Sequence, residues 1–313
     1  MQPTRALSAN HKKNLLICLD AFGTLFTPKE PISVTYAHAA TRHGLPIDGG
    51  KDADQVMQSF KRAFKGEAQR YPNYGRSCNM GPEKWWSNVI NHTFQPFLEP
   101  KERVPRALST ELYQKFATKE AYSLYPDVKD FFLELQKYKI SRPTKLIQWP
   151  YEKVIIGVIT NSDNRVPGIL QSFGLEVASR RFDTTTKFDA DYDPDKDIDF
   201  VVMSYDVGHE KPDRRIFDAA TSILSETLAS DKKGSKAEDF EKLYVGDDLE
   251  NDWDGAKAAG WAAVLLDRSG MTDRAKRFQI GGWGMEDRSG SNRRVLLAKS
   301  LLDVFQWRSA SAF

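Results

Sequence analysis

Five short segments of almost uninterrupted apolar residues determine most of what this chain can fold into. They are rich in Val, Ile and Leu, and stretches with helical periodicity separate most of them. Continuous apolar runs are typical of strands that are covered on both faces. Their alternation with helices predicts an α/β fold built on a doubly wound parallel sheet. The expected strands are residues 14–19, 154–160, 200–204, 242–245 and 261–266.

The region from about residue 28 to 120 breaks this alternation. It carries helical periodicity and no convincing strand, which predicts a helical cap domain inserted after the first strand. Residues 14–27 and 121–313 would then form the α/β core, with a C-terminal extension from about residue 268 whose amphipathic end docks on the core. Residues 1–13 are expected to be a disordered leader.

Aromatic residues crowd the middle of the inserted region. Packing in the core of a small helical domain is the favoured interpretation, and a cage around a substrate is the alternative. The residues concerned are Tyr71, Tyr74, Trp85, Trp86, Phe94 and Phe97.

Composition and charge limit the classes of partner. Of 313 residues, 45 are Lys or Arg and 43 are Asp or Glu, so a formal net charge of +2 offers no large excess for holding nucleic acid. No predicted element approaches the roughly 20 apolar residues of a membrane-spanning helix. We expect a protein with a small-molecule substrate and no membrane or nucleic-acid partner. The cytoplasm is the expected location, the nucleus is a second, and the basic leader favours mitochondria only weakly. The sequence predicts no oligomeric state.

Polar residues follow three of the expected strands at the edge where ligands bind in a doubly wound sheet. Asp20 follows the first strand. Thr160 and Asn161 close the second, where we expect a helix to begin and its free amides to favour an anion. Lys211 follows the third and is expected to open another helix. Each feature alone has a plainer explanation, such as a helix cap or a solvated lysine, but together they predict a site.

Acidic residues follow the fourth strand in the run GDDLEND. Asp247 and Asp252 supply the oxygen ligands that a hard cation such as Mg²⁺ prefers. With Asp20 and Lys211 they would provide an oxygen nucleophile and positive charge, which are the parts that phosphoryl transfer needs.

Four motifs in order resemble those of the haloacid dehalogenase-like superfamily. They are LDAFGTL, VITNS, GHEKPDRRIF with Lys211, and VGDDLENDWDGAKAAG, and the resemblance spans about residues 15–267. The helical insertion resembles the cap that this family carries after its first motif. Within it, YPNYG at residues 71–75, followed by Trp85 and Trp86, resembles the branch that includes haloacid dehalogenase-like hydrolase domain-containing protein 3.

The resemblance implies a role for each matching residue. Asp20 would be the nucleophile that forms a covalent intermediate. Thr160 would bind the transferred group with support from Asn161, and Lys211 would neutralise charge. The cap would close over the site and select the substrate.

The resemblance also implies a magnesium site. Asp20, Asp247 and Asp252 would hold Mg²⁺ together with the backbone carbonyl of Phe22, and Asp248 would support them.

Phe22 departs from the phosphatase pattern, which has an aspartate at this position. A general acid is worth about 10² to 10⁴ in rate, and Phe22 cannot donate a proton. We therefore expect a Mg²⁺-dependent phosphatase that acts on a small phosphorylated metabolite through an aspartyl intermediate, either slowly or on activated phosphates. The first alternative is a 2-haloacid dehalogenase, which tolerates an aromatic residue here but needs no metal. The second is a non-catalytic binding or regulatory protein.

Overall fold

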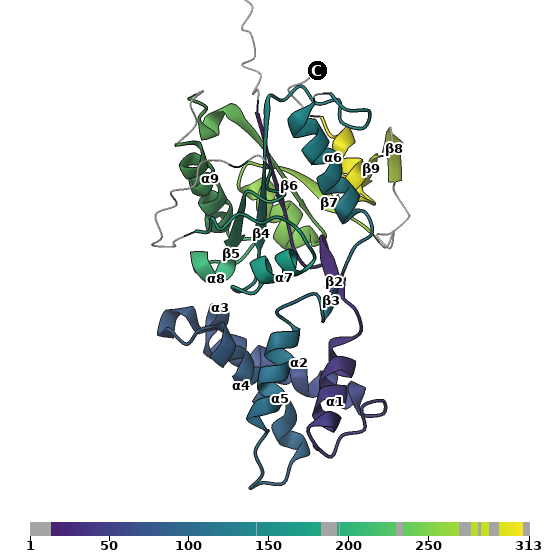
Figure 1. The fold of residues 1–313 in the computed structure, drawn as a ribbon, viewed down its shortest axis with the longest axis vertical. Helices are drawn as coiled ribbons and strands as arrows, with labels where there is room; N and C mark the ends of the chain where they lie inside the picture. The colour runs from purple at the N-terminus through teal and green to yellow at the C-terminus, as the bar shows by residue number, and fades with distance from the viewer. Residues whose placement is uncertain are drawn as a thin grey trace, which may run out of the picture.

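The computed structural model of the chain shows an α/β unit and a group of helices beside it (Figure 1). It describes residues 14–141, 143–182, 193, 195–229, 234–268, 277–280, 283–287 and 294–308. The expected leader, residues 1–13, lies outside the described residues, as does part of the C-terminal extension.

The described strands of the first unit form one eight-stranded sheet in the order β5-β4-β1-β6-β7-β10-β9-β8. The strands from β5 to β10 are parallel, which confirms the predicted doubly wound α/β fold, and the β8–β9 hairpin adds an antiparallel edge that we had not predicted. The bounds are β1 (Asn14–Leu19), β4 (Lys153–Thr160), β5 (Phe200–Met203), β6 (Phe240–Gly246), β7 (Ala262–Leu266), β8 (Arg277–Ile280), β9 (Trp283–Asp287) and β10 (Arg294–Ala298).

Helices cover both faces of the sheet, which explains the continuous apolar strands. In β1, Leu15, Ile17 and Leu19 pack in the same cluster as α6 and α7. Leu16 and Cys18 point to the opposite face and pack with α9 and α10. The helices of this unit are α6 (Val128–Ile140), α7 (Val166–Ser172), α8 (Ser204–Val207), α9 (Arg214–Leu228) and α10 (Gly255–Ala258), with short turns at η3 (Ala237–Asp239), η4 (Leu249–Asp254) and η6 (Leu301–Gln306).

The described end of the chain packs on this unit. Leu297 of β10 pairs with Leu265 of β7 in parallel. Phe305 in η6 stacks on Phe131 of α6 with 5.1 Å between the ring centroids.

Three helix starts differ from the sequence prediction. The helix after Lys211 begins at Arg214, because the Asp213 side chain accepts a hydrogen bond from the backbone nitrogen of Arg215 and caps it there. The helix after Asn161 begins only at Val166, so its amides do not follow Asn161 directly. The sequence pattern over residues 252–259 predicts a further helix, but the helical turns here begin earlier, at Leu249, as a π-helix.

The second unit lies between two short strands, β2 (Phe26–Pro28) and β3 (Tyr122–Leu124). They pair antiparallel and so carry the chain into and out of the helices at one place. The sequence analysis missed them because three residues are too few to show a strand pattern. The helices between them are α1 (Ile32–Arg42), α2 (Ala53–Arg70), α3 (Pro72–Gly75), α4 (Pro82–Phe94) and α5 (Arg106–Lys115), with turns at η1 (Arg76–Cys78) and η2 (Gln95–Phe97).

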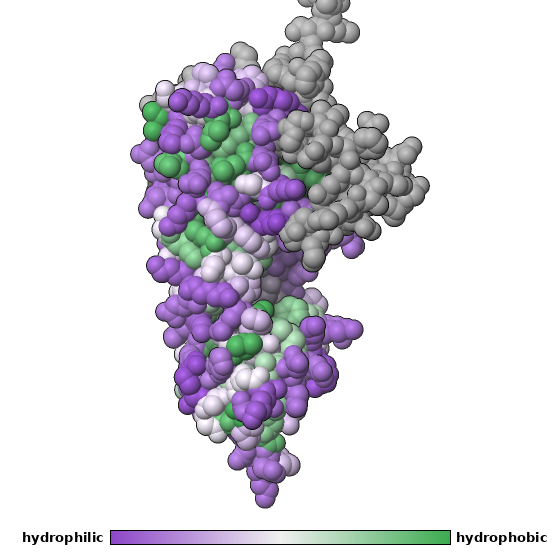
Figure 2. All heavy atoms as spheres, turned by 90° about the vertical axis from the view of Figure 1, so that its right-hand side faces the viewer, coloured by the Kyte–Doolittle hydropathy of each residue, from purple (hydrophilic) through white to green (hydrophobic). Residues whose placement is uncertain are grey.

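The surface visible in Figure 2 is mostly hydrophilic, and its hydrophobic residues form small separate groups. Among the described residues, no helix has the length and apolar character needed to cross a membrane.

Candidate active site

The ends of the central strands bring most of the predicted site residues together. Because β1 lies between β4 and β6, Asp20 emerges beside the ends of both. The backbone nitrogen of Asp20 donates a 2.9 Å hydrogen bond to the carbonyl of Val245, which extends the strand pairing up to the carboxylate. Asp20 is 7% exposed. The carboxylate is thus held by strand geometry rather than by a loop.

Lys211 lies at the centre of the site and is almost fully buried. Its Nζ donates hydrogen bonds to Asp20 Oδ1 at 2.6 Å and to Asp252 Oδ1 at 2.7 Å. A third bond, of 2.7 Å, goes to the hydroxyl of Tyr244. Burial alone would lower the pKa of Lys211, but the charges of Asp20 and Asp252 raise it above its usual value. The side chain is therefore a fixed cation.

Asp20 is harder to keep ionised. Its pKa is raised to about 7, mainly by burial. The negative charge of Asp252 adds to the rise, and Lys211 opposes it. A further cation close to the carboxylates would favour the ionised form that a nucleophile needs.

Asp20, Asp247 and Asp252 together fit a hard divalent cation. Each offers one carboxylate oxygen, and the three oxygens lie within 4.8 Å of one another. Burial, and after it the neighbouring charge of Asp252, raise the pKa of Asp247, so a cation beside these carboxylates would favour their ionised forms. An all-oxygen set suits Mg²⁺ better than Zn²⁺. The expected contribution of the Phe22 carbonyl stays a prediction.

Two glycines make room for these carboxylates. A Cβ atom on Gly246 would lie 2.2 Å from Asp252 Oδ2, and one on Gly23 would lie 2.2 Å from Asp247 Oδ2. Gly23 also has a φ of +78°, which other residues rarely adopt. The glycines of the GDD and FGT sequences therefore let the backbone lie close to the carboxylates of Asp252 and Asp247.

Thr160 and Asn161 occupy the end of β4. Thr160 is its last residue and is 1% exposed. The Asn161 side chain accepts a 2.6 Å hydrogen bond from the Lys211 backbone nitrogen and donates one of 2.9 Å to the Lys211 carbonyl. Asn161 thus fixes the backbone that carries the cation.

Phe22 lies among aromatic rings instead of beside a proton-transfer partner. Its ring meets Phe26 edge-on at 4.7 Å and Tyr122 at 5.6 Å between centroids. It also lines a cavity of about 290 Å³ between the helical unit and the sheet. Tyr74 and Trp86 line the same cavity, and both also pack against the helical cluster that contains Trp85, as the favoured interpretation expects. Trp85, which is 1% exposed, does pack there.

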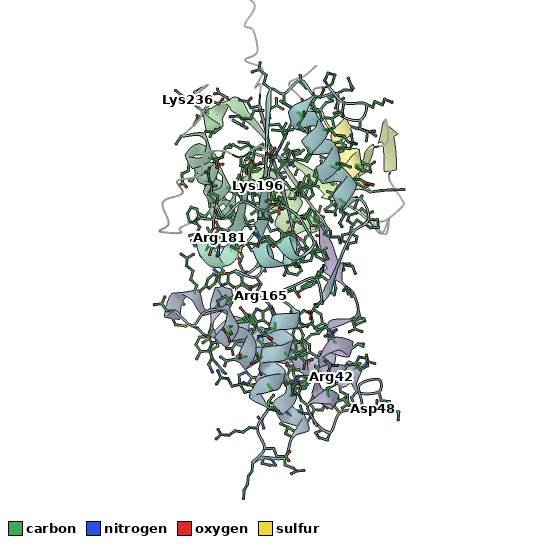
Figure 3. The ribbon with its side chains drawn as sticks, viewed as in Figure 1. Arg42, Asp48, Arg165, Arg181, Lys196 and Lys236 are labelled. Carbon is green, nitrogen blue, oxygen red and sulfur yellow. The ribbon has the colours of Figure 1, made fainter. Side chains whose placement is uncertain are left out.

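The sequence analysis missed a buried ion pair at the junction of the two units. Arg165 binds the fully buried carboxylate of Asp163 through Nε at 2.9 Å and Nη2 at 2.8 Å. Trp86 Nε1 donates to the same carboxylate at 2.7 Å, and its ring lies 4.6 Å from the guanidinium carbon of Arg165. Figure 3 shows Arg165 where the helices meet the sheet unit. The sequence feature that could have indicated this ion pair is SDNR, directly after the second motif, which places Asp163 two residues before Arg165.

A second junction contact involves the tip of the helical unit. Asn73 Nδ2 donates a 2.7 Å hydrogen bond to the carbonyl of Ser204, and Arg76 Nη1 donates one of 2.9 Å to that of Tyr205. Asn73 has a φ of 49°, a conformation that costs energy for a residue other than glycine. The YPNYG segment, through Asn73, therefore makes a specific contact with the sheet unit.

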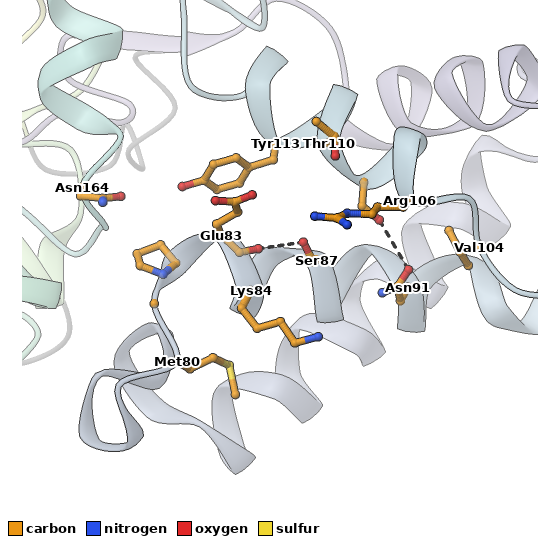
Figure 4. A pocket seen from close by; sticks show the side chains of 13 residues that line it. Met80, Glu83, Lys84, Ser87, Asn91, Val104, Arg106, Thr110, Tyr113 and Asn164 are labelled. Atoms are coloured by element: carbon orange, nitrogen blue, oxygen red, sulfur yellow. Dashed lines mark hydrogen bonds between the residues drawn. The ribbon is translucent and has the colours of Figure 1, made fainter.

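A larger groove of about 600 Å³ lies between α4 and α5 (Figure 4). Its lining is polar and includes Glu83, Lys84 and Arg106, none of them close in sequence to the carboxylate cluster. Tyr113 lines both this groove and the aromatic cavity. Among its described lining residues Glu83 is the one acid, so the groove has no counterpart of the carboxylate cluster around Asp20.

The model of the haloacid dehalogenase-like hydrolase family matches residues 15–260, well over half of the chain. The chain belongs to the haloacid dehalogenase-like hydrolases. Each of the four motifs that carry this identity supplies a residue to the described site, namely Asp20, Asn161, Lys211 and Asp252.

Two curated proteins and one solved structure illustrate what this chain is similar to. An uncharacterised hydrolase of Schizosaccharomyces pombe is 30% identical over 260 residues, which are 83% of this chain and 93% of that protein. Haloacid dehalogenase-like hydrolase domain-containing protein 3 of Bos taurus is 25% identical over 80% of this chain and 81% of its own length, in line with the branch that the YPNYG segment predicted. A solved structure of a HAD phosphatase from Thermococcus onnurineus covers 94% of this chain and 96% of its own, with 18% identity and a TM-score of 0.48.

Proposed function

We propose that this haloacid dehalogenase-like hydrolase is a Mg²⁺-dependent phosphatase that cleaves small phosphate monoesters through a covalent intermediate on Asp20. The observation that carries the proposal is the arrangement of three carboxylates and one buried ammonium at the ends of β1 and β6. Dehalogenation of a carbon–halogen bond needs no such set of acids, whereas the charge of a phosphoryl group requires cations around it.

In the proposed first step, a carboxylate oxygen of Asp20 attacks phosphorus and the ester P–O bond breaks. The leaving oxygen departs with the bonding electron pair and takes its proton from solvent. In the second step, water attacks phosphorus, loses a proton to solvent, and releases inorganic phosphate with the Asp20 carboxylate regenerated. Lys211 stays charged throughout and offsets the negative charge that accumulates beside Asp20.

Thr160 and Asn161 have supporting roles in this proposal. Thr160, at the end of β4, would bind an oxygen of the transferred group. Asn161 holds Lys211 through its two backbone hydrogen bonds, so it acts by positioning the cation.

Asp20, Asp247, Asp252 and the carbonyl of Phe22 would hold Mg²⁺. The metal would supply positive charge that favours the ionised Asp20 and balances the phosphoryl oxygens. The helical unit, as a cap, would exclude water and choose the substrate.

The test uses p-nitrophenyl phosphate, whose leaving group hardly needs a proton. We expect turnover that requires Mg²⁺ and falls by at least 10³-fold in Asp20→Asn. Asp54→Asn, an exposed acid on α2, is the matched control and should keep full activity. Equal activity of Asp20→Asn and the native chain would overturn the proposal.

One observation favours a second candidate, a 2-haloacid dehalogenase. Phe22 and the aromatic cavity would suit the alkyl part of a 2-haloacid, and no acid is needed at position 22 because halide leaves without a proton. Halide release from 2-chloropropionate without metal would establish this activity in place of phosphatase chemistry. Failure of both assays would favour a non-catalytic binding or regulatory protein.

A further inference from the structure

The aromatic cavity between the two units lies directly beside the proposed reaction site at Asp20. Phe22, two residues after Asp20, forms part of its wall. Asn161, which is hydrogen-bonded to the backbone of Lys211, forms another part. A phosphate monoester bound at Asp20 therefore has this cavity beside it for the remainder of the molecule.

The wall of the cavity is mainly aromatic. Rings come from all the larger helices of the second unit, and the core adds the ring of Phe22. The aromatic lining includes Phe22, Tyr36, Phe60, Tyr74, Trp86 and Phe116. Such a wall favours flat apolar groups, because rings gain contact energy from stacked and edge-to-face packing.

The cavity offers no unpaired charge among its described lining residues. Arg165 is the charged residue there, and Asp163 binds its guanidinium through two hydrogen bonds while Trp86 covers it. The polar groups of the wall are a few neutral hydroxyls and one amide, such as those of Tyr36, Ser162 and Asn161. A sugar or an amino acid would therefore exchange much of its hydration for contact with a mainly apolar wall. The lining therefore disfavours the polar alcohols found in many metabolites.

The size of the cavity fits one substituted ring. Its volume is about 290 Å³. An apolar cavity of about 150 Å³ is enough to hold benzene. A single aromatic ring with its substituents, or two fused rings, would fill the space.

The lining also lacks a good proton donor. Phe22 has no acidic group, and burial raises the pKa of Tyr74 well above the usual value of tyrosine. An alkyl alcohol would leave slowly from such a site, while a phenol, with a pKa of about 10, leaves more readily without a proton.

We propose that the cavity selects aryl phosphates, with the aromatic ring of the leaving group held between Phe22 and the rings of the helical unit. The inference rests on the proposed phosphatase function. It adds the class of substrate: phosphate esters of phenols in preference to those of sugars or other polar alcohols.

The test measures binding, so that leaving-group reactivity plays no part. Phenylphosphonate and methylphosphonate are titrated calorimetrically into the full chain with Mg²⁺. Burial of the ring should make phenylphosphonate bind about 10- to 100-fold more tightly. Equal affinities would overturn the inference.

Two variants locate the ring. Ile32→Trp fills the cavity from α1, and Phe64→Ala removes a ring at its partly exposed rim. Both should reduce the preference for phenylphosphonate at least fivefold, while Ile140→Trp, at an 83% exposed site on α6, should keep it. A preference unchanged in both cavity variants would place the ring elsewhere and overturn the inference.

A separate arm tests the function on which the inference rests. Acetyl phosphate is small and activated, so its hydrolysis does not need the cavity. Hydrolysis of acetyl phosphate without a preference for the aryl phosphonate would retain the phosphatase and reject the aryl specificity. If no phosphate is hydrolysed but phenylphosphonate still binds more tightly than methylphosphonate, the proposed phosphatase function is wrong and the preference of the cavity for an aromatic ring stands.

Discussion

The indole nitrogen of Trp86, on the helical unit, donates a 2.7 Å hydrogen bond to the carboxylate of Asp163, which is 0% exposed on the sheet unit. The same carboxylate neutralises Arg165, so one buried anion joins the two units and removes the charge from the wall of the cavity. The two units are thus held by a specific polar contact as well as by ring packing.

Replacement of Trp86 by Phe should show what this bond contributes. The variant keeps a ring beneath Arg165 but leaves the buried carboxylate with one donor fewer. A hydrogen bond to a charged group is worth about 2 kcal/mol, and we expect the free energy of unfolding to fall by that amount. Urea denaturation followed by fluorescence and circular dichroism measures it.

Trp253→Phe is the control for the loss of ring size. Trp253 is 8% exposed, and its indole nitrogen has no hydrogen-bond partner among the described residues. Its substitution removes the same atoms without breaking a hydrogen bond. If both variants lose the same stability, the bond between Trp86 and Asp163 contributes nothing.

Gly246→Ala should damage the site without unfolding the chain. The new methyl group would lie 2.2 Å from Asp252 Oδ2, so the carboxylate must move away from Lys211. We expect phosphatase turnover to fall at least 10-fold and the Mg²⁺ concentration for half-activity to rise.

Gly66→Ala in α2 is the control. Its added Cβ meets nothing within 4 Å, so activity should persist while the free energy of unfolding rises by about 0.5 to 1 kcal/mol.

The change Phe22→Asp should restore a general acid. Turnover of an alkyl phosphate should rise by about 10²-fold. That of p-nitrophenyl phosphate should not rise, because its leaving group hardly needs a proton and its ring loses the contact with Phe22. Phe22→Asn has nearly the same shape but no proton to donate, and it loses the same contacts with Phe26 and Tyr122. An equal gain in the Asn variant would contradict the proton-transfer explanation, and steady-state kinetics distinguish the two.

The sequence predicted the parts of the site that depend on strand ends. Asp20, Lys211 and Asp252 each follow an apolar strand, and strand order alone then places them at one edge. Tyr244 was missed because it looks like one more strand residue, although its hydroxyl contacts Lys211. The bond between Trp86 and Asp163 was missed for another reason. It depends on how the two units pack, and the two residues are 77 positions apart, so no local sequence pattern can predict their contact.

The stability of the core should depend on pH through Asp199. Its carboxylate accepts a 2.7 Å hydrogen bond from the backbone nitrogen of Ile156 and lies 3.8 Å from Lys139 Nζ. Burial raises its pKa to about 6, against the lowering effect of Lys139. Because the pKa of Asp199 is higher in the folded chain than in the unfolded chain, protonated Asp199 stabilises the fold. This contribution is complete below about pH 4 and is lost as the pH rises through 6.

Asp199→Asn does not titrate, so its free energy of unfolding relative to the native chain should rise by up to about 3 kcal/mol between pH 4 and 7. Urea denaturation across this range measures the difference, and a flat difference for Asp199→Asn would mean that burial does not raise its pKa.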